Sequence, residues 1–448
     1  MSVRPNAAIH RLMVARKRSW NTLTVEDHHL NGSSPAAENR AVGGVNGAVI
    51  FAMLALLSFL PSAARFLLDA SSLMAGLMAA CVLIWGMGVI GLYRIEGGRY
   101  WTNTLLVAAA VSFVVLAHGL LASLWFPLDW ARSAGSLVGM VVMLVSAYQA
   151  RTILWQATPV ALHRGLKSMS IAFIAIALLS MLKVQPASVS IFDKPAFPFT
   201  EPSHFALTFA PFLIYQCVVT RLPVKLVWLA GTLGVALVLQ NLSLVLAVGV
   251  AAVCCLPGLW LTAGLLAVIG AVGSLDLTYF TDRLDFSAQT TNLSALVYIQ
   301  GTELMDAALK ATSGWGIGFQ QLGIAPINVP TSDLIYRLSQ DDANLRDGGF
   351  QAAKLIAEMG GIGLVVVLCY AWVAARAVMM LRRNDADSRA EPLRVFVLSL
   401  IVSFSVEMFV RGLGYFSGTA MLQVTALLLV MEGGFLRRTS PKDHPCPV

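Results

Sequence analysis

The sequence has few charged residues: Asp, Glu, Lys and Arg make up only 12% of its 448 positions. Average soluble domains carry about a quarter charged residues, so this chain has too few to cover a surface that faces water. The residues A, V, I, L, M, F, W, Y and C account for 57% of the chain. This composition excludes a soluble enzyme, a disordered chain and a disulfide scaffold. It predicts an all-α polytopic integral membrane protein.

Cysteine and histidine are also scarce, with 6 and 7 residues respectively. None of the cysteine spacings resembles a metal site or a disulfide framework, and most of the cysteines lie in apolar runs that favour simple packing. The adjacent His28 and His29 lie in a polar N-terminal tail, where solvated side chains are the ordinary case. The sequence therefore predicts no bound metal and no cofactor.

The motifs of soluble enzymes are missing, because the chain has no P-loop, no Rossmann fingerprint, no GxSxG and no HExxH. The G-x-G formed by Gly316 and Gly318 follows no strand pattern, so we expect a turn there. Basic residues are spread along the edges of the apolar segments instead of forming one face interleaved with aromatic residues. The sequence therefore excludes a nucleic acid as partner.

Long apolar runs are what the sequence does contain. About 20 apolar residues cross a bilayer as a helix, and the runs predict about twelve transmembrane helices. The run at 242–256 is short for a span, and only brief polar separators divide the stretch 224–274. The predicted spans are 42–62, 70–92, 103–123, 134–150, 168–183, 203–219, 224–240, 242–256, 258–274, 351–375, 393–410 and 412–433.

Lysine and arginine concentrate in the N-terminal tail and in alternate segments between these spans. Because cytoplasmic segments of membrane proteins are rich in Lys and Arg, an even number of spans places both termini in the cytoplasm. The predicted organisation is a basic cytoplasmic tail (1–40), transmembrane helices one to nine (41–274), a large periplasmic loop (275–350), helices ten to twelve (351–435) and a cytoplasmic tail (436–448).

The large loop between spans nine and ten carries its own helical pattern. Apolar residues recur at helical spacing from Leu293 to Leu309, which predicts an amphipathic helix across 291–312 that packs against the membrane domain. The glycine-rich stretch 314–318 ends this pattern, and a second short helix is expected around 332–341.

Ionisable residues gather in three clusters at the predicted outer ends of the spans. In the first, Glu201 and His204 flank Pro202 at the entry to the sixth span. A helix start offers backbone donors to an anion, and an acid and a base lie beside it. The alternative is a purely structural helix start in which Ser203 caps the span.

The second cluster leads out of the large loop. Arg346 suits a phosphate because its guanidinium is a planar fork. Glu358 lies about two turns into a predicted span, where an ionisable group needs a partner or a wet cavity. The alternatives are a solvated Arg346 and a simple helix pair between Lys354 and Glu358, which stand four residues apart.

The third cluster is Glu407 and Arg411, again four residues apart at the outer end of span eleven. A structural ion pair and a functional pair are both open interpretations of this spacing. His118 stands alone in the third predicted span, which is typical of an interior histidine that serves packing instead of catalysis.

Four segments carry a resemblance to a known family. They are FPFTEPSHFALTFAPF (197–212), LQNLSLVLAVGV (239–250), GWGIGFQQLG (314–323) and DGGFQAAKLIAEMGGIGLV (347–365). With the chain layout over residues 41–435, they resemble the O-antigen polymerase/ligase superfamily. Within it, the sequence is most similar to the Wzy-type polysaccharide repeat-unit polymerases.

The resemblance implies a metal-independent glycosyltransferase of the bacterial inner membrane. Such an enzyme transfers a growing glycan from undecaprenyl diphosphate to a hydroxyl of the next lipid-linked repeat unit, for O-antigen, capsule or exopolysaccharide. It implies an undecaprenyl-diphosphate-linked oligosaccharide and membrane lipid as partners, together with a chain-length-determining copolymerase.

The resemblance also implies roles for individual residues. Outer-loop arginines of the family bind diphosphate or position glycans, a role that falls here on Arg283, Arg346 and Arg411. From their own positions in the clusters, and not from the resemblance, Glu358 and Glu407 are expected to contact substrate. The transfer also needs a base for the acceptor hydroxyl, and Glu201 or His204 is the candidate.

Two other functions stay open from the sequence. O-antigen ligases usually carry a catalytic histidine in the large outer loop, and residues 275–350 contain none. A flippase or another transporter would place charged residues at the middle of the bundle, whereas the ionisable residues here lie near the predicted outer ends of spans.

Overall fold

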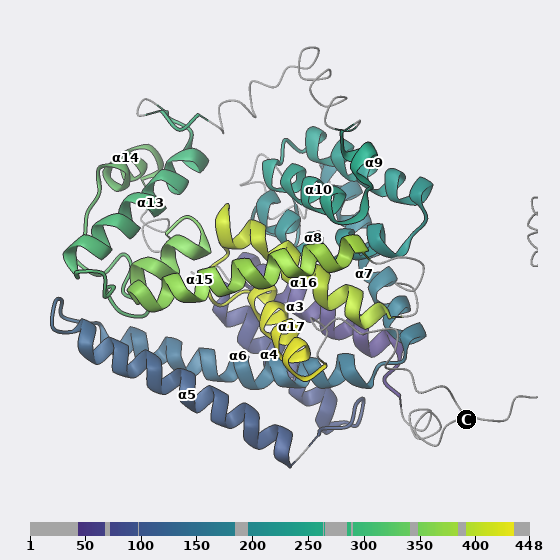
Figure 1. Cartoon of the computed structure of the whole chain (residues 1–448), viewed down its shortest axis with the longest axis horizontal. Coiled ribbons are helices and arrows are strands. Elements are labelled where there is room, and N and C mark those ends of the chain that lie inside the picture. Colours follow the sequence, from purple (N-terminus) through teal and green to yellow (C-terminus); the bar gives the residue numbers. More distant parts are fainter. Residues whose placement is uncertain are drawn as a thin grey trace, which may run out of the picture. The chain divides into compact units, whose positions relative to one another are not determined.

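The computed structural model describes residues 44–67, 72–96, 98–183, 196–262, 264, 285–287, 290–340, 348–383 and 391–433. These residues form α-helices and no β-strand, which confirms the prediction of an all-α protein (Figure 1). Arg283, Arg346 and the predicted tails at 1–40 and 436–448 lie outside the described residues.

Within the described residues, 7 helices are long and apolar enough to cross a membrane. They are α3 (Gly47–Leu67), α5 (Arg99–Ala122), α6 (Trp130–Gln156), α7 (Pro159–Met181), α8 (Pro202–Val219), α15 (Gln351–Arg383) and α16 (Pro392–Phe409). Four further apolar helices are shorter: α4 (Met74–Val89), α9 (Leu222–Val238), α10 (Leu242–Cys255) and α17 (Gly418–Gly433). These helices are compatible with a polytopic membrane protein.

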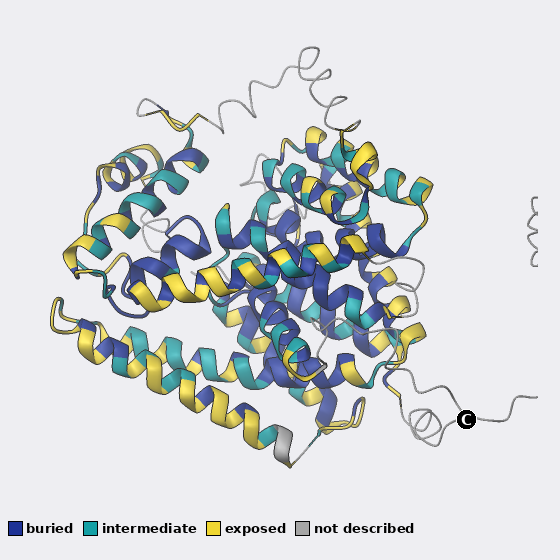
Figure 2. Ribbon diagram, viewed as in Figure 1, coloured by how far each residue is buried: buried dark blue, intermediate teal, exposed yellow. Residues whose placement is uncertain are grey.

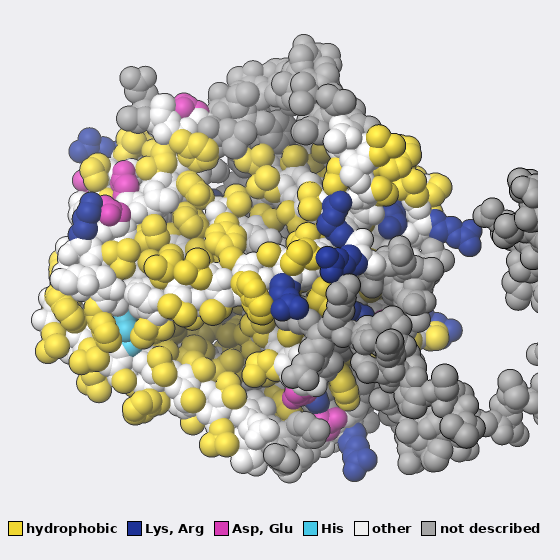
Figure 3. All heavy atoms as spheres, in the orientation of Figure 1, with side chains coloured by type: hydrophobic (Ala, Val, Ile, Leu, Met, Phe, Trp, Pro, Cys, Tyr) yellow, Lys and Arg dark blue, Asp and Glu magenta, His cyan; other side chains and the backbone are white. Residues whose placement is uncertain are grey.

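Hydrophobic side chains cover much of the face shown in Figure 3, and charged side chains take up only a small part of it. On α5, for example, Leu106, Phe113 and Leu120 are all exposed. A surface of this kind suits a lipid environment better than water.

The predicted spans and the observed helices agree in their positions along the chain but not always in their lengths. Each predicted span overlaps helical residues, but 258–274 does so only at 258–262 and 264 and lies largely outside the described residues, so the count of twelve spans stays a prediction. Helix α7 begins at Pro159, nine residues before the predicted start of the fifth span at 168. There the Thr158 hydroxyl accepts a hydrogen bond from the Ala161 backbone, and Pro159 occupies the first helical turn.

Helix α6 continues beyond its predicted end because its last turns carry a buried ion-pair network. Arg151 is almost fully buried and pairs with Glu96, which follows α4, and with Glu432 at the end of α17. A buried guanidinium is tolerated only when it is paired and hydrogen-bonded. Hydropathy ends the span at this polar stretch, whereas the paired charges allow the helix to continue to Gln156.

Helix α8 lies at the centre of the packing. Every residue from His204 to Val219 is buried, and α8 packs against both α10 and α16 (Figures 1 and 2). Near its start, the rings of Phe205 and Phe209 contact Phe173 of α7, with ring centroids 5.8 and 5.3 Å apart. This packing holds the first turn of α8 in a defined position, which matters for the site described below.

The two helices predicted within residues 275–350 are confirmed. Helix α13 (Leu293–Ala311) is preceded by Asn292, whose side chain accepts a hydrogen bond from Ser294 N, and α14 (Pro330–Ser339) follows. Leu304 and Ala308 are buried on the face of α13, which packs against α15 and α14. The amphipathic pattern therefore marked a face that packs on other helices.

The glycine-rich stretch after α13 forms the expected turn and fits against a break in α15. Gly314, Gly316 and Gly318 all have positive φ, and α15 is interrupted at Gly360, whose φ is 56°. Carbonyl groups left without helical partners at this break accept hydrogen bonds from the turn: Gly318 N lies 2.9 Å from Glu358 O. In return, Gly361 donates to Gly314 O at 3.0 Å.

We expect Gly360→Ala to lower the free energy of unfolding by about 2 kcal/mol, because the position combines strain with a steric clash. An added Cβ there would lie 2.0 Å from the Trp315 carbonyl oxygen. The neighbouring Gly361→Ala is the matched control, since its Cβ meets no atom within 4 Å. Thermal unfolding of the detergent-purified variants tests this, and equal melting temperatures would contradict the described turn.

Candidate functional site

A cavity of about 710 Å³ opens among the starts of α8 and α10, the side of α13 and the end of α16. This volume is in the usual range for small-molecule sites. One part of its lining is polar, namely Glu201, Ser203, Gln240, Asn241, Ser243, Ser294 and Arg411. The other part is apolar or aromatic and includes Val245, Leu246, Phe286, Tyr298, Phe409 and Val410. The cavity therefore suits a ligand with both a polar and an apolar part.

An ion pair between Glu201 and Arg411 forms the polar part of this cavity. Arg411 Nη2 lies 2.9 Å from Glu201 Oε2, and the Ser203 hydroxyl donates to the same oxygen at 2.9 Å. The side chains of Arg411 and Glu201 keep 23% and 43% exposure, so both are accessible from the cavity. The structure thus brings together candidates from two sequence clusters that lie 210 residues apart.

The pKa of the Glu201 carboxyl is set by opposing effects. Burial raises it, but the positive charge of Arg411, with smaller contributions from His204 and Ser203, lowers it to about 2. Because the pKa falls on folding from 4.5 to about 2, the ion pair stabilises the fold at neutral pH. That contribution is lost as the pH falls from about 4.5 through 2. While Arg411 holds it, Glu201 is therefore ionised and a weak base.

Two helix starts converge at this end of the cavity. Glu201 occupies the position before α8 and Pro202 its first turn. Asn241 precedes α10, accepts a hydrogen bond from Leu244 N at 3.2 Å and donates through Nδ2 to the Pro202 carbonyl at 2.6 Å. Both helices direct the positive ends of their dipoles toward this region, which favours an anion.

The structure adds two details to the sequence interpretation of this region. Ser203 does not cap α8, because its hydroxyl is directed to the Glu201 carboxylate. Asn241 lies between the predicted spans 224–240 and 242–256, where it joins the starts of two helices and lines the cavity. An Asn immediately before an apolar run is an N-cap signal, so the sequence did carry a sign of it.

The two candidate bases have different surroundings. His204 is buried, and its Nδ1 is hydrogen-bonded to the Thr200 hydroxyl at 2.9 Å. Glu201, by contrast, lines the cavity. Since a base must reach the proton it removes, the geometry favours Glu201.

Glu407 and Arg411 do not form the ion pair that their spacing allows. Helix α16 ends at Phe409, so Arg411 leaves the face on which Glu407 lies and reaches Glu201 instead. Glu407 is fully buried and accepts a hydrogen bond from Ser417 at 3.3 Å. It thereby holds the start of α17 near the end of α16. Its expected contact with substrate stays a prediction.

Glu358 is also fully buried. Its backbone carbonyl accepts a hydrogen bond from Gly318 of the glycine-rich turn, and Leu322 N, beyond that turn, approaches its Oε1 at 3.5 Å. The Lys354 ammonium lies 5.1 Å from the centre of the Tyr415 ring, so the expected second cluster joins α15 to the segment before α17. A direct contact of Glu358 with substrate stays a prediction as well.

His118 does have a partner, which the sequence did not indicate. Its ring stacks on Trp315 with centroids 5.2 Å apart, and its Nε2 donates to the Trp315 carbonyl at 2.9 Å. The indole nitrogen of Trp315 returns a hydrogen bond to the His118 carbonyl at 3.3 Å. This confirms an interior histidine that serves packing, here by joining α5 to the glycine-rich turn.

Arg283 and Arg346 are outside the described residues, so Arg411 is the one predicted diphosphate-binding arginine whose surroundings are known. Among the described residues, no group of three or more His, Cys, Asp or Glu side chains is arranged to hold a metal ion. A scan against protein-family models and a search of the curated proteins each found no match to this chain.

Proposed function

We propose that this chain is a polymerase of undecaprenyl-diphosphate-linked oligosaccharide repeat units in the bacterial inner membrane. The observation that carries the proposal is the cavity in which the Glu201–Arg411 ion pair lies beside an apolar wall. A lipid-linked diphosphate has the same two chemistries, an anionic head and an apolar chain. The resemblance of the segments around Glu201 to Wzy-type polymerases supports the same function.

In this proposal Arg411 binds the diphosphate of the donor. Its planar guanidinium can bond two phosphate oxygens at once, and the converging helix starts of α8 and α10 add to the binding of an anion. The diphosphate then competes with Glu201 for Arg411. Because Arg411 is what keeps the pKa of Glu201 low, this competition makes Glu201 a stronger base only when donor is bound.

The transfer step uses both residues. A hydroxyl of the acceptor unit attacks the anomeric carbon of the donor sugar, and Glu201 takes the hydroxyl proton. The bond between that carbon and the diphosphate oxygen breaks, and a glycosidic bond forms. The electron pair leaves with undecaprenyl diphosphate, whose charge Arg411 compensates. No metal is required at any point of this step.

The proposed orientation follows from the sequence. With both termini in the cytoplasm and twelve spans, the starts of α8 and α10 face the periplasm, where lipid-linked repeat units are polymerised. Product length then depends on a copolymerase that acts together with this chain.

The experiment that tests the function is deletion of the gene, followed by analysis of the undecaprenyl-linked oligosaccharides. We expect single repeat units to accumulate on the periplasmic face of the inner membrane, with no long chains anywhere. Long chains that stay on the lipid carrier would indicate a ligase. Single units confined to the cytoplasmic face would indicate a flippase and would contradict the proposal.

A further inference from the structure

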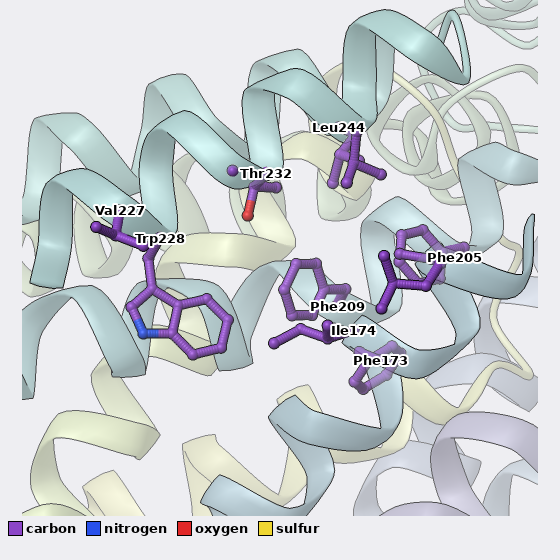
Figure 4. Close-up of a pocket in the computed structure, with 12 residues that line it drawn as sticks. Phe173, Ile174, Phe205, Phe209, Val227, Trp228, Thr232 and Leu244 are labelled. Carbon is purple, nitrogen blue, oxygen red and sulfur yellow. The ribbon is translucent and has the colours of Figure 1, made fainter. Parts of the chain in front are cut away.

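A second cavity, of about 390 Å³, lies among α7, α8, α9 and α10. Figure 4 shows side chains from these helices around it. Its deeper wall is aromatic and buried, with Phe173, Phe205 and Phe209 at 4% exposure or less. Its rim is apolar and exposed, formed in part by Leu178 of α7 and Val227 of α9. An apolar cavity with an exposed apolar rim is open to the interior of the bilayer in a chain that spans the membrane.

The two cavities share the first turns of α8 and α10. Ser203 lines the first cavity and Phe205 lines the second; likewise Ser243 lines the first and Leu244 the second. Phe205 follows Glu201 by four residues, which corresponds to about 6 Å along a helix axis. The aromatic cavity therefore begins about one helical turn from the ion pair.

The proposed reaction needs two lipid-linked substrates at one site, a donor and an acceptor, and each carries an apolar chain. The first cavity provides one apolar wall, which includes Val245, Leu246 and Phe409. That wall can accompany the chain of the donor whose diphosphate binds Arg411. The chain of the second substrate needs a separate apolar volume within reach of Glu201.

We propose that the aromatic cavity binds the prenyl chain of the second lipid-linked substrate, the acceptor. This inference rests on the proposed function and names the substrate part that the second cavity takes. Inside a bilayer, burial from water does not favour the site, because lipid tails are already apolar. Close packing against the rings of Phe173, Phe205 and Phe209 supplies the attraction, and the shared first turn of α8 places the acceptor head at the ion pair.

Helix α9 offers a matched pair of variants to test this. Gly231 lines the aromatic cavity, and an added Cβ there meets no atom within 4 Å. Gly231→Phe is therefore expected to place its ring in the cavity. Gly234 is exposed three residues later, has the same open surroundings and is not among the lining residues, so Gly234→Phe is the control.

The measurement is native mass spectrometry of the detergent-purified full chain titrated with undecaprenyl phosphate. We expect two bound lipids for the wild type and for Gly234→Phe, and one for Gly231→Phe. Two lipids on Gly231→Phe, or one on the wild type, would overturn the proposal. A parallel titration uses phosphatidylglycerol in place of undecaprenyl phosphate. If phosphatidylglycerol occupies the second position equally well, the cavity is a general lipid site, and the proposal is overturned.

The lipid-binding test and the gene-deletion test can fail independently of each other. Gene deletion reports on polymerisation and does not depend on the aromatic cavity. If deletion abolishes long chains while Gly231→Phe still binds two lipids, only the assignment of the aromatic cavity fails. If deletion leaves long chains in place, the proposed function fails whatever the lipid count.

Discussion

Replacing Arg411 by alanine is expected to reduce polymer formation by about 10²- to 10³-fold, the usual cost of removing a donor that compensates transition-state charge. The reason is that Arg411 is the charged group of the cavity lining that pairs with Glu201 and is available to a diphosphate. Arg411→Lys keeps the charge but loses the planar fork, so it is expected to recover only part of the activity. The measurement is polymer formation in membranes supplied with lipid-linked repeat units.

The matched control for Arg411 is Lys310→Ala. Lys310 is a cation on α13 that is 76% exposed, and its ion pair with Asp306 is a surface pair of the kind that contributes little to stability. It lies outside the cavity lining. Wild-type activity of a normally expressed Arg411→Ala variant would show that this arginine does not bind the diphosphate.

Glu201→Gln is expected to lower kcat by about 10²- to 10⁴-fold while the chain still folds, because glutamine keeps the shape of the side chain but cannot accept the proton. The Ser203 hydroxyl can still donate to the amide oxygen, although the ion pair with Arg411 is lost. Turnover of donor and acceptor by the purified variant, set beside its melting temperature, separates lost chemistry from lost stability. Asp306→Asn, which removes an exposed carboxylate of α13, is the control.

The pH dependence gives this prediction a second readout. In the free enzyme the pKa of Glu201 is about 2, so kcat/KM should show no acid limb from this residue at higher pH. With the diphosphate on Arg411, the pKa of Glu201 rises. As the pH decreases, kcat should therefore begin to fall at a higher pH than kcat/KM does. Glu201→Gln should remove this difference. Coincident profiles in the wild type would indicate that Arg411 stays paired with Glu201 throughout the reaction.

Most helices of the membrane domain could be predicted from the sequence because apolar run length is a local property that a bilayer selects directly. The amphipathic helix α13 was predicted for the same kind of reason, since its buried face repeats at helical spacing. The prediction was weaker where a helix continues through charged residues. Hydropathy could not extend α6 past Arg151, because the ion pairs that allow its burial come from Glu96 and Glu432, far away in the chain.

In the candidate site, too, some features could be predicted from the sequence and others could not. The sequence by itself determined which residue types stand at helix starts and ends: Glu201 beside Pro202 before α8, and Arg411 just beyond α16. Only the tertiary structure decided which of them meet. Arg411 pairs with Glu201 and not with Glu407 because α16 ends at Phe409, and the packing of α8 against α16 brings the two side chains to one cavity.

The partners of the buried ionisable side chains could not be predicted from the sequence either. The sequence made Glu358 and Glu407 candidates and assigned His118 to packing, yet the partners of these side chains come from other segments of the chain, namely Leu322, Ser417 and Trp315. Spacing along one helix specifies only neighbours on that helix. Which side chain faces a cavity, and which is enclosed by a distant segment, depends on how the helices pack, and that was decided by the tertiary structure alone.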